Sequence, residues 1–260
     1  MRTWLLLVLA GCGFQHGSAG QQLSDGARDG SADAPADAKG SGSDAKVFMD
    51  AATPSAITFV QGHGVATGLN AASISDTFPL PQHALDLNVV VVSWTGVAAS
   101  VTGVSDGAGN TYTRIGSAFS QSTEKMDVWY AKDILALATN TTVTATFDAT
   151  VAAPELRLLE YAGLSTTAPF DTTNQGQASG SRTMTTGAAT TTHAYDLLIG
   201  CETSTDTVKN LGTGYTLRVT AGGDIVEDRI VTMTGSYTAD ATLYNNADWM
   251  MRIVAFEGVP

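Results

Sequence analysis

From Ser55 onward the chain consists of short runs rich in Val, Ile, Thr, Tyr and Phe, separated by Gly, Asn, Asp and Pro. β-Branched and aromatic residues favour strands, whereas Gly, Pro, Asn and Asp favour turns. No long stretch has the apolar period of an amphipathic helix, and the nearest candidate, residues 132–138, would span only about two turns. The pattern predicts an all-β, antiparallel β-sandwich over residues 55–260.

Two segments indicate how strands are oriented. Residues 87–94 are apolar on both faces, which predicts a central strand covered on both sides. In residues 141–148, Val143, Ala145 and Phe147 alternate with threonines, which predicts one buried face. We expect strands near residues 56–60, 72–79, 85–95, 100–105, 111–119, 124–131, 141–148, 155–162, 182–190, 195–203, 215–220, 225–234, 236–244 and 249–257.

A faint internal duplication divides this region into two similar halves. Three pairs of segments match: Asp86-Leu87 with Asp196-Leu197, Gly109–Ile115 with Gly214–Val219, and Leu156–Gly163 with Met251–Gly258. Two halves of four or five strands fit one jelly-roll-like sandwich or two small immunoglobulin-like units. We prefer one sandwich, because no Pro-rich or Ser-rich linker separates the halves.

Residues 1–11 carry Arg2 near their start and an apolar run from Trp4 to Ala10. This run is too short for a membrane-spanning helix, which needs roughly 20 apolar residues. A charged start, a short apolar segment and a small residue at its end are typical of a secretory signal. The sequence Leu9-Ala10-Gly11-Cys12 resembles the lipobox of bacterial lipoproteins.

This resemblance implies cleavage between Gly11 and Cys12 and acylation of Cys12, so that the chain is anchored to a membrane through lipid. Several acyl chains together anchor a protein stably. Gly13 follows the cysteine, in place of the Asp that retains many lipoproteins at the inner membrane, so the resemblance implies the outer membrane of the cell envelope. The alternative is an ordinary secretory signal in which Cys12 occurs by chance.

Residues 12–54 consist mainly of Gly, Ser, Ala and Asp and have few aliphatic side chains. Such a segment cannot offset the entropy cost of ordering, so we predict a disordered tether. About 38 residues of flexible coil have a mean reach of roughly 35 Å.

The chain is acidic, with 25 Asp and Glu against 13 Lys and Arg. Binding to phosphates depends on clustered basic residues, and none of these forms a run, so we expect no nucleic-acid partner. The two cysteines are Cys12 and Cys201. Cys201 lies in the apolar run 197–201, where we expect it to pack as a small hydrophobic residue rather than act as a reactive thiol.

The common catalytic motifs are absent: Gly-x-Ser-x-Gly, His-Glu-x-x-His, a phosphate-binding loop with Lys, and Cys-x-x-Cys. His63, His83 and His193 lie singly in predicted loops, where a solvated imidazole is the ordinary interpretation. Glu160 and Glu257 lie in the matched segments of the repeat and form a candidate carboxylate pair for a glycan hydrolase. We prefer structural roles for both at strand ends and assign no catalytic residue.

Two groups of oxygen-bearing residues suit Ca²⁺, which prefers six to eight oxygen ligands. They are Asp224 with Glu227 and Asp228, and Asp106 with Asn110. Neither group matches a defined calcium loop, and turn residues need no ion. We therefore assign no metal ligand and expect no cofactor, with structural Ca²⁺ as the alternative.

One strand carries candidates for ligand binding. In residues 124–131, Met126 and Val128 belong to an apolar face, which leaves Trp129 on the polar face beside Lys125 and Asp127. Because exposed indole rings bind sugars, we name Lys125, Asp127 and Trp129 as candidate ligand-binding residues. The alternative is that a second layer or a loop covers Trp129, since large aromatic side chains are mostly buried.

Together these features predict a surface-anchored, non-catalytic binding or adhesion module for glycan, cell wall or an envelope protein. One alternative is a lipoprotein glycan hydrolase that uses a carboxylate pair. Another is a structural subunit of an envelope complex.

Overall fold

The computed structural model describes residues 56–259, which contain sixteen strands and no helix. None of these residues therefore forms a helix that could span a membrane. The strands are β1 (Thr58–Ala66), β2 (Ala71–Thr77), β3 (Leu87–Thr95), β4 (Val101–Asp106), β5 (Thr113–Arg114), β6 (Phe119–Gln121), β7 (Glu124–Ala131), β8 (Thr142–Ala162), β9 (Phe170–Thr185), β10 (Ala189–Thr190), β11 (Asp196–Ser204), β12 (Val208–Asn210), β13 (Thr216–Ala221), β14 (Asp224–Val231), β15 (Ser236–Tyr237) and β16 (Asp240–Glu257).

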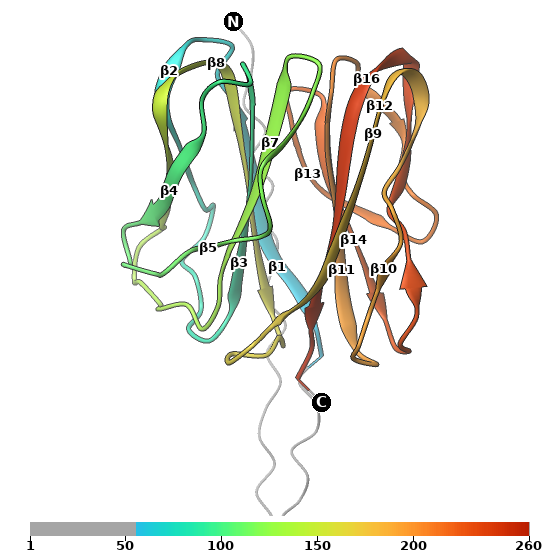
Figure 1. The fold of residues 1–260 in the computed structure, drawn as a ribbon. Helices are drawn as coiled ribbons and strands as arrows, with labels where there is room; N and C mark the ends of the chain where they lie inside the picture. The colour runs from blue at the N-terminus through green and yellow to red at the C-terminus, as the bar shows by residue number, and fades with distance from the viewer. Residues whose placement is uncertain (1–55, 260) are drawn as a thin grey trace, which may run out of the picture. The chain divides into compact units, whose positions relative to one another are not determined.

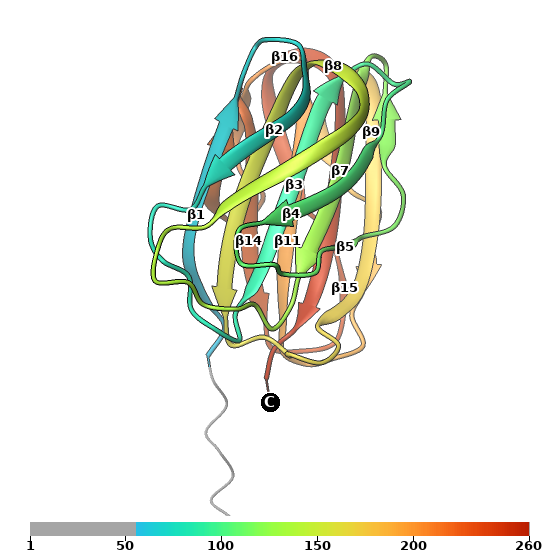
Figure 2. The same ribbon diagram turned by 90° about the vertical axis from the view of Figure 1, so that its left-hand side faces the viewer.

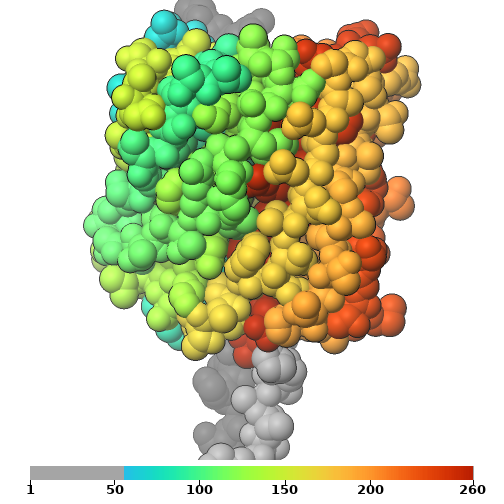
Figure 3. Space-filling view, viewed as in Figure 1, coloured from blue at the N-terminus to red at the C-terminus, as the bar shows by residue number. Residues whose placement is uncertain are grey.

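Two large antiparallel sheets pack face to face, as Figure 1 shows. The first sheet has the order β1-β8-β3-β7-β5, with β2 and β4 on β8 and β6 on β7. The second has the order β12-β16-β11-β14-β13, with β9 on β16, and β10 pairs separately with β15. This arrangement confirms the predicted all-β antiparallel sandwich. In Figure 3 the green first half and the yellow and orange second half meet along a seam.

The long strand β8 turns a corner and joins two layers. Residues 142–151 of β8 pair with β2 and β4, whereas the residues after the corner pair with β1 and β3. At the corner Ala153 has a φ of 44° and is followed by Pro154. In Figure 2, β2, β4 and the first part of β8 lie in front of the large sheet that contains β3 and β7. Each half is therefore a small sandwich of its own.

Three hydrophobic cores fill the spaces between these layers. β3 is buried along nearly its whole length because alternate residues enter different cores, which confirms the prediction of a strand covered on both sides. The central core joins the halves and includes Leu87, Val89, Val91, Leu159, Leu197, Ile199, Cys201, Val254 and Phe256. The outer core of the first half includes Phe78, Val90, Val92, Trp94 and Leu158, and that of the second half includes Met184, Leu198, Trp249, Met251 and Ile253.

The strand registers repeat between the halves. Leu87 on β3 lies opposite Tyr161 on β8, and Leu197 on β11 lies opposite Phe256 on β16. The matched segments of the sequence therefore occupy matched positions in the two large sheets.

Several predicted strand limits were wrong. β9 begins at Phe170, far earlier than the predicted strand 182–190. Residues 170–181 are rich in Thr, Gln, Gly and Ser, which is typical of a loop, but β9 is an edge strand that pairs only with β16 and leaves many side chains exposed. The predicted strand 111–119 is divided into β5 and β6 by Gly116, whose φ is 63°. β8 and β16 are each continuous where the sequence predicted two strands.

A fully buried arginine ties the first half to the second. The guanidinium of Arg157 on β8 donates to the backbone oxygens of Glu202 (2.6 Å) and Ile225 (3.3 Å) in the second half, and to Ser93 Oγ (2.8 Å) in its own half. Hydrogen bonds from a charged donor are stronger than neutral ones, so these contacts stabilise the packing of one sheet against the other.

Arg252 on β16 occupies the position that matches Arg157 and makes the reciprocal contact. It donates to the backbone oxygens of Ile115 and Ser117 in the first half, both at 2.7 Å, and to Gln175 Oε1 in its own half. The two halves are thus joined by a crossed pair of arginines as well as by apolar packing.

We expect Arg157→Met to lower the free energy of unfolding by about 3 kcal/mol, because it removes the charged donor from two buried backbone oxygens and the ion-pair partner of Asp224. Urea unfolding followed by tryptophan fluorescence measures this change. Arg182→Met, at an exposed position, is the control and should change stability by less than about 0.5 kcal/mol. Equal stability of the two variants would contradict the role given to Arg157.

Candidate functional site

A polar pocket lies between the two halves at one end of the sandwich. Its volume is about 140 Å³, and its lining comes from both halves: Ser93, Trp94, Thr95, Glu124, Ala153, Glu155, Thr203, Ser204, Gly222 and Asp224. The pocket therefore exists only because the halves pack together.

The pocket lies far from the point where the chain enters the sandwich. β1 begins at Thr58, which is opposite Ala162, and the last described residue, Val259, donates its N–H to Gly163. The pocket is lined by Thr95, at the other end of the nine-residue strand β3. At about 3.3 Å per residue, β3 separates these two ends by roughly 30 Å.

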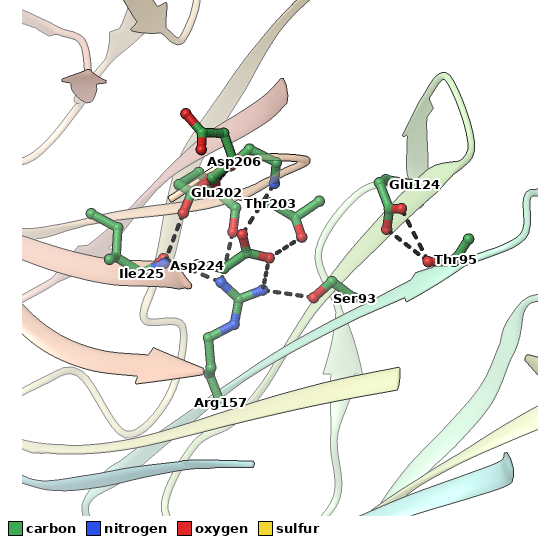
Figure 4. Close-up of polar contacts among 10 residues, drawn as sticks. Ser93, Thr95, Glu124, Arg157, Glu202, Thr203, Asp206, Asp224 and Ile225 are labelled. Carbon is green, nitrogen blue, oxygen red and sulfur yellow. Dashed lines mark hydrogen bonds and ion pairs between the residues drawn. The ribbon is translucent and has the colours of Figure 1, made fainter. Parts of the chain in front are cut away.

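Carboxylates dominate the pocket and its wall, as Figure 4 shows. Asp224 accepts hydrogen bonds from Thr203 Oγ1 and from the N–H of Ser204 (3.1 Å), and Arg157 Nη2 lies 3.8 Å from its Oδ2. Glu202, behind the pocket, accepts the N–H of Ile225 (2.8 Å) through Oε1, while its buried Oε2 has no donor. The nearby guanidinium is already engaged by backbone oxygens.

The other two carboxylates come from the first half. Both oxygens of Glu124 lie within reach of Thr95 Oγ1, at 3.0 and 3.3 Å. Glu155 lies against Gly222, where a Cβ would overlap Glu155 Oε1. Gly222 also has a φ of 61°, so glycine is required there for both its backbone conformation and its small size. Glu155 Oε2 is buried and has no donor.

Burial and mutual repulsion change the protonation of these groups. Burial, followed by the charge of Asp224, raises the pKa of Glu155 to about 8. Burial also raises the pKa of Asp224, although Arg157 opposes this shift, and it raises the pKa of Glu202 well above its usual range. A pKa of about 8 leaves Glu155 protonated at neutral pH, so that it can donate to Asp224, while the oxygens of Glu124 and Asp224 remain acceptors. Such a group of acceptors suits a cation.

The residues predicted to bind a ligand lie on β7, and none of them lines this pocket. Each of the three has a partner within the chain. Lys125 Nζ donates to the backbone oxygens of Val97 and Ala99 and to a serine hydroxyl. Asp127 is fully buried and forms an ion pair with Arg114 at 2.8 Å. Trp129 is half-buried, packs against the outer core of the first half and has Arg114 over its ring at 5.9 Å.

Glu160 and Glu257, the candidate carboxylate pair, lie in different clusters. Glu160 is fully buried and accepts Gln61 Nε2 (2.6 Å) and the N–H of His83 (3.0 Å). Glu257 Oε1 lies 3.5 Å from His193 Nε2. The two carboxylates therefore lie at strand ends in different halves of the sandwich.

The groups considered for calcium have intramolecular partners. Asp106 accepts hydrogen bonds from the backbone of Ala108, from the backbone and side chain of Asn110, and from Tyr112, as a turn residue does. In the other group, Asp224 lies in the polar pocket, Glu227 accepts the N–H of Gly212, and Asp228 binds Arg218 and Tyr161.

Cys201 is buried in the central core, as predicted, and burial raises the pKa of its thiol to about 11.

Sequence reasoning missed two groups of side chains. His83 lies with Asp86 and Glu160, and His193 lies with Asp171 and Asp196, with the ligand atoms of each group within 4.8 Å of one another. These two histidines are therefore not isolated, although His83 is exposed and His193 is partly exposed. A signal was present, because His-Ala-x-Asp-Leu occurs at residues 83–87 and again at residues 193–197.

The residues of the predicted signal, lipobox and tether, including Gly11 and Cys12, lie outside the described part of the chain. No family model matches the chain, and neither a curated protein nor a solved structure matches it.

We expect the free energy of unfolding to fall as the pH rises from about 5 to about 8. Besides Glu155, burial raises the pKa of Asp86 and of Asp196 to about 7, so the folded chain holds protons that the unfolded chain releases near its usual carboxyl pKa. Stability decreases with pH wherever the folded state binds more protons. Urea unfolding at several pH values measures the slope. Glu155→Gln should reduce it between about pH 6 and 8, and an unchanged slope would contradict the raised pKa.

Proposed function

We propose that the chain is a lipid-anchored protein of the outer membrane, held through Cys12, and that its β-sandwich is a non-catalytic binding module. In this proposal the polar pocket receives a positively charged group, such as an ammonium, that a glycan, the cell wall or an envelope protein carries. The observation that carries the proposal is the chemistry of the pocket lining. Three carboxyl groups line the pocket, and the guanidinium of the nearby Arg157 already binds backbone oxygens of the protein.

The chemistry of the pocket favours a cation over an anion or a neutral sugar. Glu124, Glu155 and Asp224 present oxygens from both halves, and Arg157 is committed to Glu202 and Ile225. An anion would meet the oxygens of Glu124 and Asp224, whereas an ammonium can donate up to three hydrogen bonds to them. A volume of about 140 Å³ admits the tip of such a group rather than a whole saccharide chain.

The position of the pocket supports binding by an anchored protein. The chain enters the sandwich beside Thr58, and the pocket lies at the opposite end of β3. A tether attached at residue 56 would thus present the pocket on the side away from its attachment, where a partner has access.

A glycan hydrolase is the second candidate, and one observation favours it. Glu155 is protonated at neutral pH and lies beside Asp224, so the pocket holds a carboxylic acid next to a carboxylate. Glycosidases use two such groups as acid and base or nucleophile. Glu155→Gln distinguishes the two candidates, since it would abolish turnover of a glycan by a hydrolase but would only weaken cation binding by a module.

Replacement of Cys12 should remove the chain from membranes. We expect wild-type protein to label with palmitate and to sediment with the outer membrane, and Cys12→Ser to do neither, because only cysteine offers the thiol that is acylated. Cys201→Ser is the control and should still label. A Cys12→Ser precursor that still labels and sediments would contradict lipid anchoring.

Binding to a polymer that carries amino groups should depend on the pocket. We expect the full chain at about pH 6, where the amino groups of chitosan are charged, to bind chitosan oligomers at least 10-fold more tightly than the fully N-acetylated oligomers. Glu124→Gln should weaken chitosan binding about 10-fold, whereas Asp133→Asn, at an exposed site outside the pocket, should not. Isothermal titration measures both, and equal binding of the two oligomers would overturn the assignment.

A further inference from the structure

Four side chains from three segments of the second half converge at the end of the sandwich opposite the polar pocket. Asp171 lies on β9, His193 and Asp196 lie just before and at the start of β11, and Glu257 ends β16. The ligand atoms of Asp171, His193 and Asp196 lie within 4.8 Å of one another. Their carboxylate and imidazole groups are the ones that bind divalent metals.

The two ring nitrogens of His193 face different carboxylates. Nδ1 lies 3.7 Å from Asp171 Oδ1, and Nε2 lies 3.5 Å from Glu257 Oε1. Ligands bound tetrahedrally at 2.0 to 2.2 Å from a zinc ion are about 3.4 Å apart, so the first spacing needs little adjustment. The second contact matches the carboxylate that commonly orients a metal-binding histidine from outside the ligand shell.

Asp196 gives a second, independent indication of a ligand. Its side chain is fully buried, and neither carboxylate oxygen has a hydrogen-bond donor. Such a group is costly to bury unless something satisfies it. Asp171 is already oriented, because Thr192 donates to it through both N–H (2.8 Å) and Oγ1 (2.6 Å).

The first half provides an internal comparison. His83 and Asp86 match His193 and Asp196 in sequence, and Glu160 completes their group. There Glu160 already accepts donors from Gln61 and from the backbone of His83. In Asp86 one carboxylate oxygen, Oδ2, is buried without a donor. In Asp196 both carboxylate oxygens are buried without a donor. The two clusters therefore differ in how many buried oxygens of the motif's aspartate lack a donor: one in Asp86 and two in Asp196.

We infer that Asp171, His193 and Asp196 bind one divalent transition-metal ion of the zinc class, with Glu257 orienting the imidazole. A nitrogen ligand combined with carboxylates suits Zn²⁺, whereas Ca²⁺ prefers six to eight oxygens. The side chain of His193 is 42% exposed, which gives the ion a route to the site. The ion would join the ends of β9, β11 and β16 beside the point where the chain enters the sandwich.

Titration of the metal-free full chain with Zn²⁺ tests this inference. We expect one Zn²⁺ per chain, at least 100-fold tighter binding than Ca²⁺, and visible absorption bands of a low-symmetry site when Co²⁺ replaces Zn²⁺. Asp196→Asn and His193→Gln should each weaken binding at least 100-fold, and Glu257→Gln by 10- to 100-fold. The matched variants Asp86→Asn and His83→Gln, and the pocket variant Glu155→Gln, should bind as wild type does.

Two controls keep the result interpretable. The urea midpoint of each variant in metal-free buffer identifies any loss of folding, and His193→Gln, at a partly exposed position, tests the site even if Asp196→Asn fails to fold. Absence of Zn²⁺ binding by the wild type would overturn the inference. So would unchanged binding by both Asp196→Asn and His193→Gln, or an equal loss in Asp86→Asn and His83→Gln.

Discussion

The contact between the two large sheets is the constraint on which the rest of the structure depends. Each half covers the outer face of its large sheet with its own small layer, but its inner face carries Val89, Val91 and Leu159 or their counterparts Ile199, Cys201 and Val254. Exposure of such a face to water is unfavourable by roughly 25 cal/mol per Å² of apolar surface, so neither half is complete alone. The pairing of the halves buries both inner faces in one core.

The crossed arginines explain why polar groups gather where they do. Arg157 and Arg252 carry charge into the interface and are stabilised only because backbone oxygens of the opposite half accept their hydrogen bonds. Beyond Arg157 the apolar core ends, and carboxylates from both halves line the polar pocket at the sheet ends. Since these carboxylates are partly shielded from water and lie close together, their pKa values are raised.

Duplication has placed the same motif in two different surroundings. His-Ala-x-Asp-Leu begins β3 and β11 alike, and in each half its Asp lies near another carboxylate. In the first half Gln61 on β1 satisfies Glu160, whereas in the second half Asp196 has no donor. Equivalent backbone positions thus differ in chemistry because the neighbouring strand supplies different side chains.

The sequence by itself determined the fold class, the two-sided burial of residues 87–94, the repeat and the core position of Cys201, because residue alternation and turn chemistry act locally. It failed for residues 170–181, whose polar composition is typical of a loop, because an edge strand draws its stability from pairing with β16 rather than from its own side chains. It also could not bring Glu155 to Asp224 or His193 to Asp171, since these pairs are separated along the chain and meet only through strand pairing and the packing of the sheets. Only the tertiary structure decided both candidate sites. The physical reason is that burial and neighbouring groups, rather than residue type, determine whether a carboxyl group is protonated and whether its oxygens have hydrogen-bond donors.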